Sequence, residues 1–131
     1  MQEPKRNDDI NGLQPYLVPR FNRVFAALER LGHHPLLVEG RRVRQRQAWL
    51  YGAGRSRWEC IKAGISPFWS RPKARRVTWT MKGKHLQGKA GDVIDRYTKY
   101  DDPKFFAALK REGAKEGLYT IPQEGCHLEW R

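Results

Sequence analysis

Two histidines and two acids in the C-terminal half of the chain have the types and spacing of a catalytic metal site. His85 lies seven residues before Asp92, and Glu124 lies three residues before His127. Two imidazoles and one carboxylate form a common catalytic zinc shell, which leaves a fourth position for water. Glu124 would then be the base that takes a proton from that water. On spacing alone a purely structural interpretation stays open. The histidines could be hydrogen-bonded polar residues, Asp92 could be an acid at a strand edge that competes with Asp95 for any role, and Glu124 could cap a loop.

The strand predicted at the C-terminus separates the roles of its polar residues. Side chains alternate between the two faces of a strand, so His127 and Glu129 share one face. Cys126, Leu128 and Trp130 share the other face, which is the apolar one. We therefore do not expect Cys126 to bind a metal ion. Glu129 is either a partner that orients a ligand histidine or a solvated acid at the rim.

Three blocks of sequence resemble the motifs of one zinc peptidase family. They read Gly-Arg-Arg-Val-Arg-Gln-Arg-Gln (40–47) with Leu-Tyr (50–51) and Gly-Arg-Ser (54–56), Gly-Lys-His-Leu-Gln-Gly-Lys-Ala-Gly-Asp (83–92), and Glu-Gly-Cys-His-Leu-Glu (124–129). The family's blocks are Gly-Tyr-Arg-Ser-x-x-Arg-Gln followed by Leu-Tyr and Gly-Arg-Ser, then Ser-x-His-x-x-Gly-x-Ala-x-Asp, then an acid, two residues and His-aromatic-Glu. This family includes VanY-type D,D-carboxypeptidases, VanX-type D,D-dipeptidases and phage L-alanyl-D-glutamate endopeptidases.

The resemblance implies a zinc peptidase with one Zn²⁺ per chain. The metal ligands would be His85, Asp92 and His127, with Glu124 as general base. Arg42 would point at the substrate carbonyl, where a fixed guanidinium stabilises the negative charge that develops on the oxygen.

The resemblance further implies that Gln47 binds substrate together with Arg42. The sequence departs from the family pattern at Arg41, Val43 and Gly83, which replace an aromatic residue and two serines. The change at Gly83 removes a hydroxyl group, which affects the expected substrate preference more than the expected catalysis.

The elements that must position these residues can be read from apolar periodicity and from capping residues. Helices are predicted at residues 19–31, 43–53 and 103–113, and strands at residues 36–39, 76–80, 91–95 and 126–130. Residues 1–13 are expected to form a loose arm, and residues 54–76 a long basic loop or insertion. The mixture predicts one α+β domain over residues 1–131. The resemblance implies a small antiparallel sheet flanked by helices, as in the Hedgehog and D,D-peptidase fold.

Charge is the strongest compositional signal in these 131 residues. The formal net charge is +12, and residues 41–76 contain eleven lysines and arginines against one acid, Glu59. Such a segment attracts a polyanion, which can be a nucleic acid, an anionic membrane surface or an anionic cell-wall polymer. The resemblance to the peptidase family implies an anionic cell-wall or outer-membrane surface. A nucleic-acid binder is a rival, because Trp49, Trp58 and other aromatic residues interleave with these cations. No recognised nucleic-acid motif is present, so we expect no specific nucleic-acid partner. A second rival is a non-catalytic wall-binding relative, against which the complete ligand set argues.

The remaining signals bear on the compartment and the substrate. Cys60 and Cys126 are too few for a disulfide scaffold and are expected as reduced thiols, although one disulfide between them is conceivable. No secretory h-region follows the N-terminus. We therefore expect a protein that is made in a bacterial cytoplasm and acts at the cell wall after membrane permeabilisation. In this the chain resembles phage endolysins, and the resemblance implies cleavage of the L-Ala–D-Glu bond of peptidoglycan stem peptides. The alternative is a D-Ala–D-Ala carboxypeptidase or dipeptidase with the same site. We also expect the protein to be a monomer.

Overall fold

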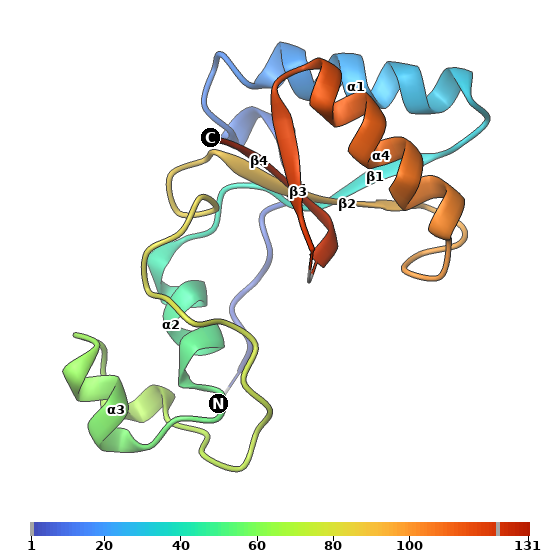
Figure 1. The fold of residues 1–131 in the computed structure, drawn as a ribbon. Coiled ribbons are helices and arrows are strands. Elements are labelled where there is room, and N and C mark those ends of the chain that lie inside the picture. The colour runs from blue at the N-terminus through green and yellow to red at the C-terminus, as the bar shows by residue number, and fades with distance from the viewer. Residues whose placement is uncertain (1, 123) are drawn as a thin grey trace.

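A four-stranded antiparallel sheet forms the centre of the protein (Figure 1). The computed structural model describes residues 2–122 and 124–131. The strands lie in the order β1-β2-β4-β3. Their bounds are Pro35–Glu39 for β1, Ala90–Asp95 for β2, Leu118–Ile121 for β3 and Glu124–Trp130 for β4. The two central strands, β2 and β4, come from distant parts of the sequence, so the middle of the sheet joins residues that are far apart in the chain.

Two helices cover one face of this sheet, namely α1 (Val18–Arg30) and α4 (Pro103–Lys115) (Figure 1). Each has an apolar stripe, and in α1 the stripe places Phe21, Val24 and Leu28 in the core with at most 1% exposure. These residues pack with others from the sheet and from α4, including Val93, Phe105, Leu109 and Leu128. The main core therefore lies between the helices and the sheet, and it leaves the other face of the sheet open for a site.

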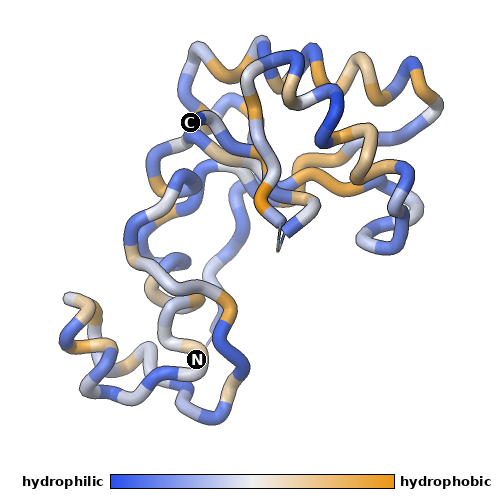
Figure 2. The backbone as a smooth tube through the Cα atoms, in the orientation of Figure 1, coloured by the Kyte–Doolittle hydropathy of each residue, from blue (hydrophilic) through white to orange (hydrophobic). Residues whose placement is uncertain are grey.

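A smaller lobe follows β1 and hangs below the open face of the sheet (Figure 1). It contains α2 (Arg44–Gly52), α3 (Arg57–Lys62) and the short 3-10 helix η2 (Pro67–Trp69). A second, small core of Ala48, Cys60, Ile65 and Met81 supports it. Figure 2 shows that apolar positions are concentrated in the sheet and its covering helices, whereas this lobe is more hydrophilic.

The N-terminal arm is not loose. The Arg46 guanidinium donates to Glu3 Oε1 at 3.0 Å and to the Pro4 carbonyl oxygen at 2.9 Å. Further along, Gly40 N–H donates to the carbonyl oxygen of Asn7 at 2.7 Å. The 3-10 helix η1 (Ile10–Gly12) and the buried Leu13 complete the attachment. The arm is polar because it is held by hydrogen bonds to polar groups. Composition alone does not distinguish such an attached polar segment from a disordered one.

Several predicted elements need correction. The segment 54–76 contains α3 and η2, because Ser56 and Glu59 form a reciprocal capping box that starts α3. Residues 76–80 form no strand; they cross the lobe as an irregular segment whose backbone is held by side chains. The last helix does not end at Gly113 but continues to Lys115. Gly113 is a packing position, because Leu128 lies where a side chain at residue 113 would lie. The strand β3 was not predicted. The other predicted helices and strands are confirmed, and so is the α+β class. No helix of the described residues has both the length and the apolar character needed to cross a membrane.

Candidate metal centre

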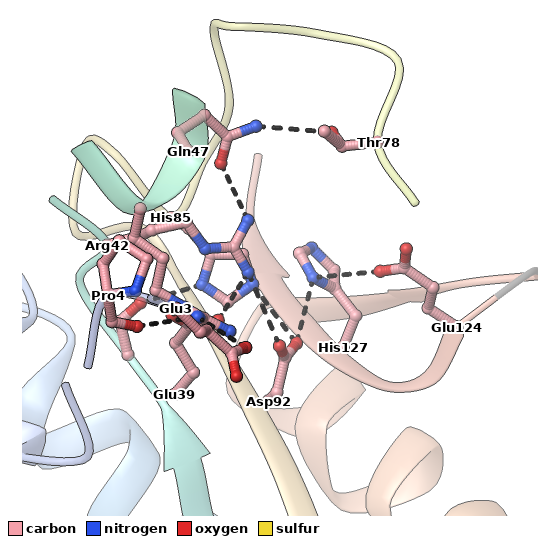
Figure 3. A network of polar contacts seen from close by, with 12 residues as sticks. Glu3, Pro4, Glu39, Arg42, Gln47, Thr78, His85, Asp92, Glu124 and His127 are labelled. Carbon is pink, nitrogen blue, oxygen red and sulfur yellow. Dashed lines mark hydrogen bonds and ion pairs between the residues drawn. The ribbon is translucent and has the colours of Figure 1, made fainter. Parts of the chain in front are cut away.

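Three ligand-type atoms from two distant parts of the sequence meet on the open face of the sheet (Figure 3). His85 Nε2 lies 3.2 Å and His127 Nδ1 lies 3.3 Å from the same atom, Asp92 Oδ1. Asp92 and His127 are cross-strand partners on β2 and β4, so their side chains share a face. His85 belongs to the turn that leads into β2. The fold therefore brings together the three residues that the motif resemblance named as ligands, with all three ligand atoms within 4.8 Å of one another.

In each imidazole, the ring nitrogen that points away from Asp92 has a hydrogen-bond partner. That hydrogen bond determines whether the other ring nitrogen carries a proton or a lone pair. His85 Nδ1 lies 2.8 Å from the Gly40 carbonyl oxygen, which can only accept a proton, so Nδ1 is the donor. His127 Nε2 lies 2.9 Å from Glu129 Oε1, which fixes the same arrangement for the second ring. In the neutral rings, the lone pairs of His85 Nε2 and His127 Nδ1 then face Asp92. Glu129 stands where a carboxylate orients a metal-binding histidine.

This arrangement fits a divalent cation. Two imidazole lone pairs and a carboxylate oxygen converge without a donor among them, and His127 Nδ1 is buried without a hydrogen-bond partner in the described part of the chain. Converging acceptors repel one another unless a positive charge lies between them. Two nitrogens and one carboxylate oxygen are the donor set that zinc prefers at catalytic sites.

The ionisation of the site also indicates an attraction for positive charge. Burial would raise the pKa of Asp92, but contact with His127 and His85 outweighs burial and holds the pKa well below its usual range. Burial would lower the pKa of His127, but the neighbouring acids Asp92, Glu129 and Glu124 outweigh burial and raise it. The acids therefore stabilise any cation at this point, whether a proton or a metal ion.

Glu124 and Arg42 lie on two sides of this group (Figure 3). Glu124 begins β4, and its Oε2 lies 3.7 Å from His127 Nδ1; half of its side chain is exposed. Arg42 lies in the loop before α2, and its Nη2 is 4.0 Å from Asp92 Oδ2. The Arg42 backbone N–H donates to the His85 carbonyl oxygen at 2.9 Å, so the loop and the turn that contains His85 are fixed together.

Gln47 lines the cleft and contacts Arg42 directly. Its Oε1 accepts from Arg42 Nη1 at 2.8 Å, and its Nε2 donates to the Thr80 carbonyl oxygen at 2.7 Å and lies 3.3 Å from Thr78 Oγ1. The side chain is almost entirely buried, with 2% exposure for the residue. Both ends of the amide are therefore used within the protein. Gln47 joins Arg42 to the segment that crosses the lobe.

Sequence reasoning missed the buried acid that holds Arg42. Glu39, at the end of β1, accepts from Arg42 Nη2 at 2.6 Å and from Arg46 Nε at 2.5 Å. Burial would raise the pKa of Glu39, but the contacts with Arg42 and Arg46 outweigh burial and lower it. A signal was present in the sequence: an acid in a buried strand next to an arginine-rich stretch has to be paired.

These residues line a cleft of about 760 Å³ between the sheet and the lobe. Its walls include Val38 and Ile121 from the sheet, and Leu50, Val77 and Trp79 from the lobe. Three-quarters of Trp79 is exposed. A cleft of this size with apolar walls and a few convergent polar groups suits a short peptide segment.

The remaining ligand-type residues play other parts. Cys60 and Cys126 are free thiols, as expected. Burial, followed by the charges of Asp92 and Glu124, raises the pKa of Cys126 to about 12, so it stays a neutral thiol beside the site. His33 does approach two acids, Asp95 and Asp102, which the sequence pattern did not show. Their carboxylates, however, accept from backbone N–H groups of the surrounding loop and of α4.

The fold is that of solved peptidoglycan peptidases, although no protein-family profile and no curated protein sequence matches the chain. A mutant of the vancomycin-resistance D,D-pentapeptidase VanY, solved in complex with Zn(II), is 18% identical with a TM-score of 0.67, and the match covers 98% of this chain and 80% of that one. The Serratia marcescens L-Ala D-Glu endopeptidase ChiX is 19% identical with a TM-score of 0.55, over 99% and 89% of the two chains. The LD-carboxypeptidase LdcB is 13% identical with a TM-score of 0.60, over 90% and 58%. The fold predicted from the motifs is confirmed by these likenesses.

Proposed function

We propose that this protein is a zinc-dependent peptidase that acts on peptidoglycan stem peptides. The observation that supports it best is the convergence of His85 Nε2, Asp92 Oδ1 and His127 Nδ1 within 4.8 Å in a cleft of peptide size. The likeness to VanY and ChiX adds support, because one neighbour was solved with Zn(II) and the other is described as an L-Ala D-Glu endopeptidase.

Each residue has a chemical task in this proposal. His85, Asp92 and His127 would hold the zinc ion, which when bound supplies Lewis acidity and activates water at neutral pH. Glu124 Oε2 would take a proton from the attacking water and return it to the leaving amine. Its exposure leaves it free to move between those positions.

Arg42 would donate a hydrogen bond to the carbonyl oxygen of the cleaved bond. The guanidinium is pre-positioned, because Glu39 and Gln47 each accept from one of its terminal nitrogens. A donor fixed before the reaction stabilises the developing oxyanion more than it stabilises the ground-state carbonyl. Glu129 would keep His127 in the tautomer that leaves Nδ1 free.

For the bond cleaved, we propose L-Ala–D-Glu, in keeping with an endolysin-type role at the cell wall of a bacterium. Support comes from the match to ChiX, which extends over 89% of that chain. Within the same proposal, the protein acts as a monomer, and the exposed cations of residues 41–76 bring it to an anionic wall surface.

The second candidate is a D-Ala–D-Ala carboxypeptidase or dipeptidase. The higher TM-score with VanY favours it, and a second VanY structure holds D-alanine-D-alanine. Both candidates use the same metal centre, so the geometry of the ligands does not separate them.

Mass spectrometry of the products released from purified peptidoglycan tests the proposal. Release of stem peptides that begin with D-Glu, dependent on zinc and abolished by a chelator, is the expected result. Zinc-dependent release of D-Ala or of D-Ala–D-Ala would move the protein to the second candidate. Absence of any zinc-dependent product, with a folded and metal-loaded protein, would contradict the proposed reaction.

A further inference from the structure

The cleft contains more positive side chains than its internal ion pairs use. Arg6, Arg42, Arg46 and Lys84 all line it. Arg42 and Arg46 share the buried carboxylate of Glu39. The side chains of Arg6 and Lys84 have no hydrogen bond or ion pair with any of residues 2–122 and 124–131.

The other acids of the cleft belong to the metal centre and do not neutralise these two cations. Asp92 lies between the two imidazoles, and Glu129 bonds to His127 Nε2. Glu124 lies 3.7 Å from His127 Nδ1 on the other side. A divalent ion at the centre would add further positive charge. The cleft is therefore electrostatically suited to an anionic group of its ligand.

The backbone holds both cations at defined places around the cleft. Arg6 lies between two anchors: the Pro4 carbonyl oxygen accepts from Arg46 at 2.9 Å, and the Asn7 carbonyl oxygen accepts from Gly40 N–H at 2.7 Å. The carbonyl oxygen of Lys84 accepts from the N–H groups of two residues in its own turn, at 3.1 and 2.8 Å. Side chains mounted on a fixed backbone lose less freedom when they bind a ligand.

We propose that Arg6 and Lys84 bind a free carboxylate of the substrate close to the cleaved bond, and that the cleft thereby selects acidic peptides over their carboxamides. This inference rests on the proposed function. An L-Ala–D-Glu substrate supplies such a group, because only one of the two carboxyl groups of D-Glu continues the peptide chain. A D-Ala–D-Ala substrate supplies it as the C-terminal carboxylate. The chemistry recognised is the same in both cases.

The test measures binding without turnover. Zinc-loaded Glu124→Ala protein is titrated by calorimetry with two pairs of synthetic stem peptides. One pair spans the L-Ala–D-Glu bond and has the free D-Glu carboxyl group as carboxylate or carboxamide. The other pair ends in D-Ala–D-Ala with a free or an amidated C-terminus. A charge-assisted hydrogen bond predicts that the carboxylate form of one pair binds about tenfold or more tightly than the carboxamide.

Neutral variants identify the residues responsible. Arg6→Gln and Lys84→Gln, each added to the Glu124→Ala protein, are expected to weaken binding of the carboxylate peptide and to leave the carboxamide peptide unchanged. Lys5→Gln and Lys82→Gln are the matched controls, because these lysines are neighbours in sequence that do not line the cleft. The controls are expected to keep the full preference.

The outcomes separate this inference from the proposed reaction. Equal dissociation constants for the carboxylate and the carboxamide in both pairs would overturn the inference. A preference that survives in both Arg6→Gln and Lys84→Gln would overturn it as well. A carboxylate preference that depends on these residues would support it, even if the wild-type protein proved unable to cleave either peptide. The latter result would contradict only the proposed reaction.

Discussion

Glu124 differs from the other acids of the cleft in its freedom to move. Half of its side chain is exposed, compared with 19% for Asp92 and 14% for Glu129. Its absence from the converging ligand group and its place at the rim suit a residue that shuttles protons. In the proposed reaction, the residues that hold the metal ion are therefore separate from the residue that moves the proton.

We predict that Glu124→Ala keeps its zinc and loses turnover, by about 100-fold or more, because general acid–base catalysis contributes effects of this size. His127→Ala is expected to lose both, because it removes one of three ligands. Zinc content by elemental analysis and kcat on a stem peptide check the two variants together. Near-normal turnover in Glu124→Ala would show that the base is another group.

Gln47 gives a second prediction, because its amide is used at both ends. Gln47→Leu removes one of the two acceptors that hold Arg42, so the guanidinium is less firmly positioned and kcat should fall by about 10- to 100-fold with little change in KM. Gln47→Glu keeps an acceptor for Arg42 and gives up the donor to Thr80, so it should retain more of kcat. A rise in KM alone, in either variant, would indicate that Gln47 contacts the substrate directly.

The role of a single residue could be predicted from the sequence where the evidence for it lies in nearby residues. The spacing of His85, Asp92 and His127 suggested a zinc site but left Asp95 in competition with Asp92. The resemblance to the peptidase motifs was needed to name the three ligands. The contacts of Glu39 with Arg42 and Arg46 were not foreseen, because they depend on how β1 meets the start of α2. A sequence shows that a buried acid needs a partner but does not name the partner.

At the scale of elements, the turn after β2 shows how a buried acid holds two elements in place. Asp95 Oδ1 accepts from His34 N–H at 2.8 Å, and Oδ2 accepts from the N–H groups of Tyr97 and Thr98 at 3.0 and 3.1 Å. Burial would raise the pKa of Asp95, but these backbone donors outweigh burial and lower it to about 2. The folded state therefore favours the ionised carboxylate.

A depressed pKa in the folded state gives a stability contribution with a definite dependence on pH. The contribution is full above the unfolded pKa of about 3.9, and it disappears as the pH falls through the folded value of about 2. Asp95→Asn, which cannot ionise, should lower the free energy of unfolding by about 1–2 kcal/mol near neutral pH. Urea unfolding at neutral pH and near pH 3 should show this difference shrinking in acid. A difference that stays constant with pH would contradict the role assigned to the charge.

Helices and strands were predictable where the apolar pattern or a capping residue was clear. The prediction failed where tertiary contacts decided the conformation. The stripe of α1 and the Asp102 cap of α4 identified both helices. A short continuous apolar run identified β1, and alternating apolar residues identified β4. Residues 76–80 have the composition of a strand, yet no strand of the sheet lies beside them. Gln47 satisfies the carbonyl oxygen of Thr80 in place of a neighbouring strand. Propensity describes what a segment tolerates, and the available partners decide which conformation forms.

At the scale of the whole molecule, the concentrated positive charge divides into two parts. Among the eleven cations of residues 41–76, four are buried or half-buried and interact with other groups of the protein: Arg42, Arg46, Arg55 and Arg71. Arg55 lies over the ring of Tyr51 and Arg71 over that of Trp49. The exposed remainder includes Lys62, Lys73 and Arg75, on the lobe that hangs below the sheet. The positive charge that an external partner can reach is therefore smaller than the number of lysines and arginines in this segment implies, and it lies on the lobe.

This exposed group leads to a prediction about wall binding. Binding of the protein to purified anionic cell walls should weaken steeply between about 50 and about 200 mM salt, because surface charges more than a Debye length apart are screened in that range. Replacing Lys62, Lys73 and Arg75 with glutamine should weaken wall binding at low salt and remove most of its salt dependence. Sedimentation with the walls measures both effects, and kcat on a small soluble stem peptide should not change, since none of the three residues lines the cleft.

The control for that prediction is a pair of exposed lysines on the opposite layer. Lys104 and Lys110 of α4 are also exposed, so Lys104→Gln with Lys110→Gln removes charge without touching the lobe. If both sets of variants weakened binding in proportion to the charge removed, net charge would be the cause and the lobe would have no special part. If neither salt nor the lobe variants changed binding, the cations would serve only to keep the protein in solution. A loss confined to the lobe variants would show that the lobe beside the cleft, which also contains Gln47 and the wall formed by Trp79, holds the protein against the polymer.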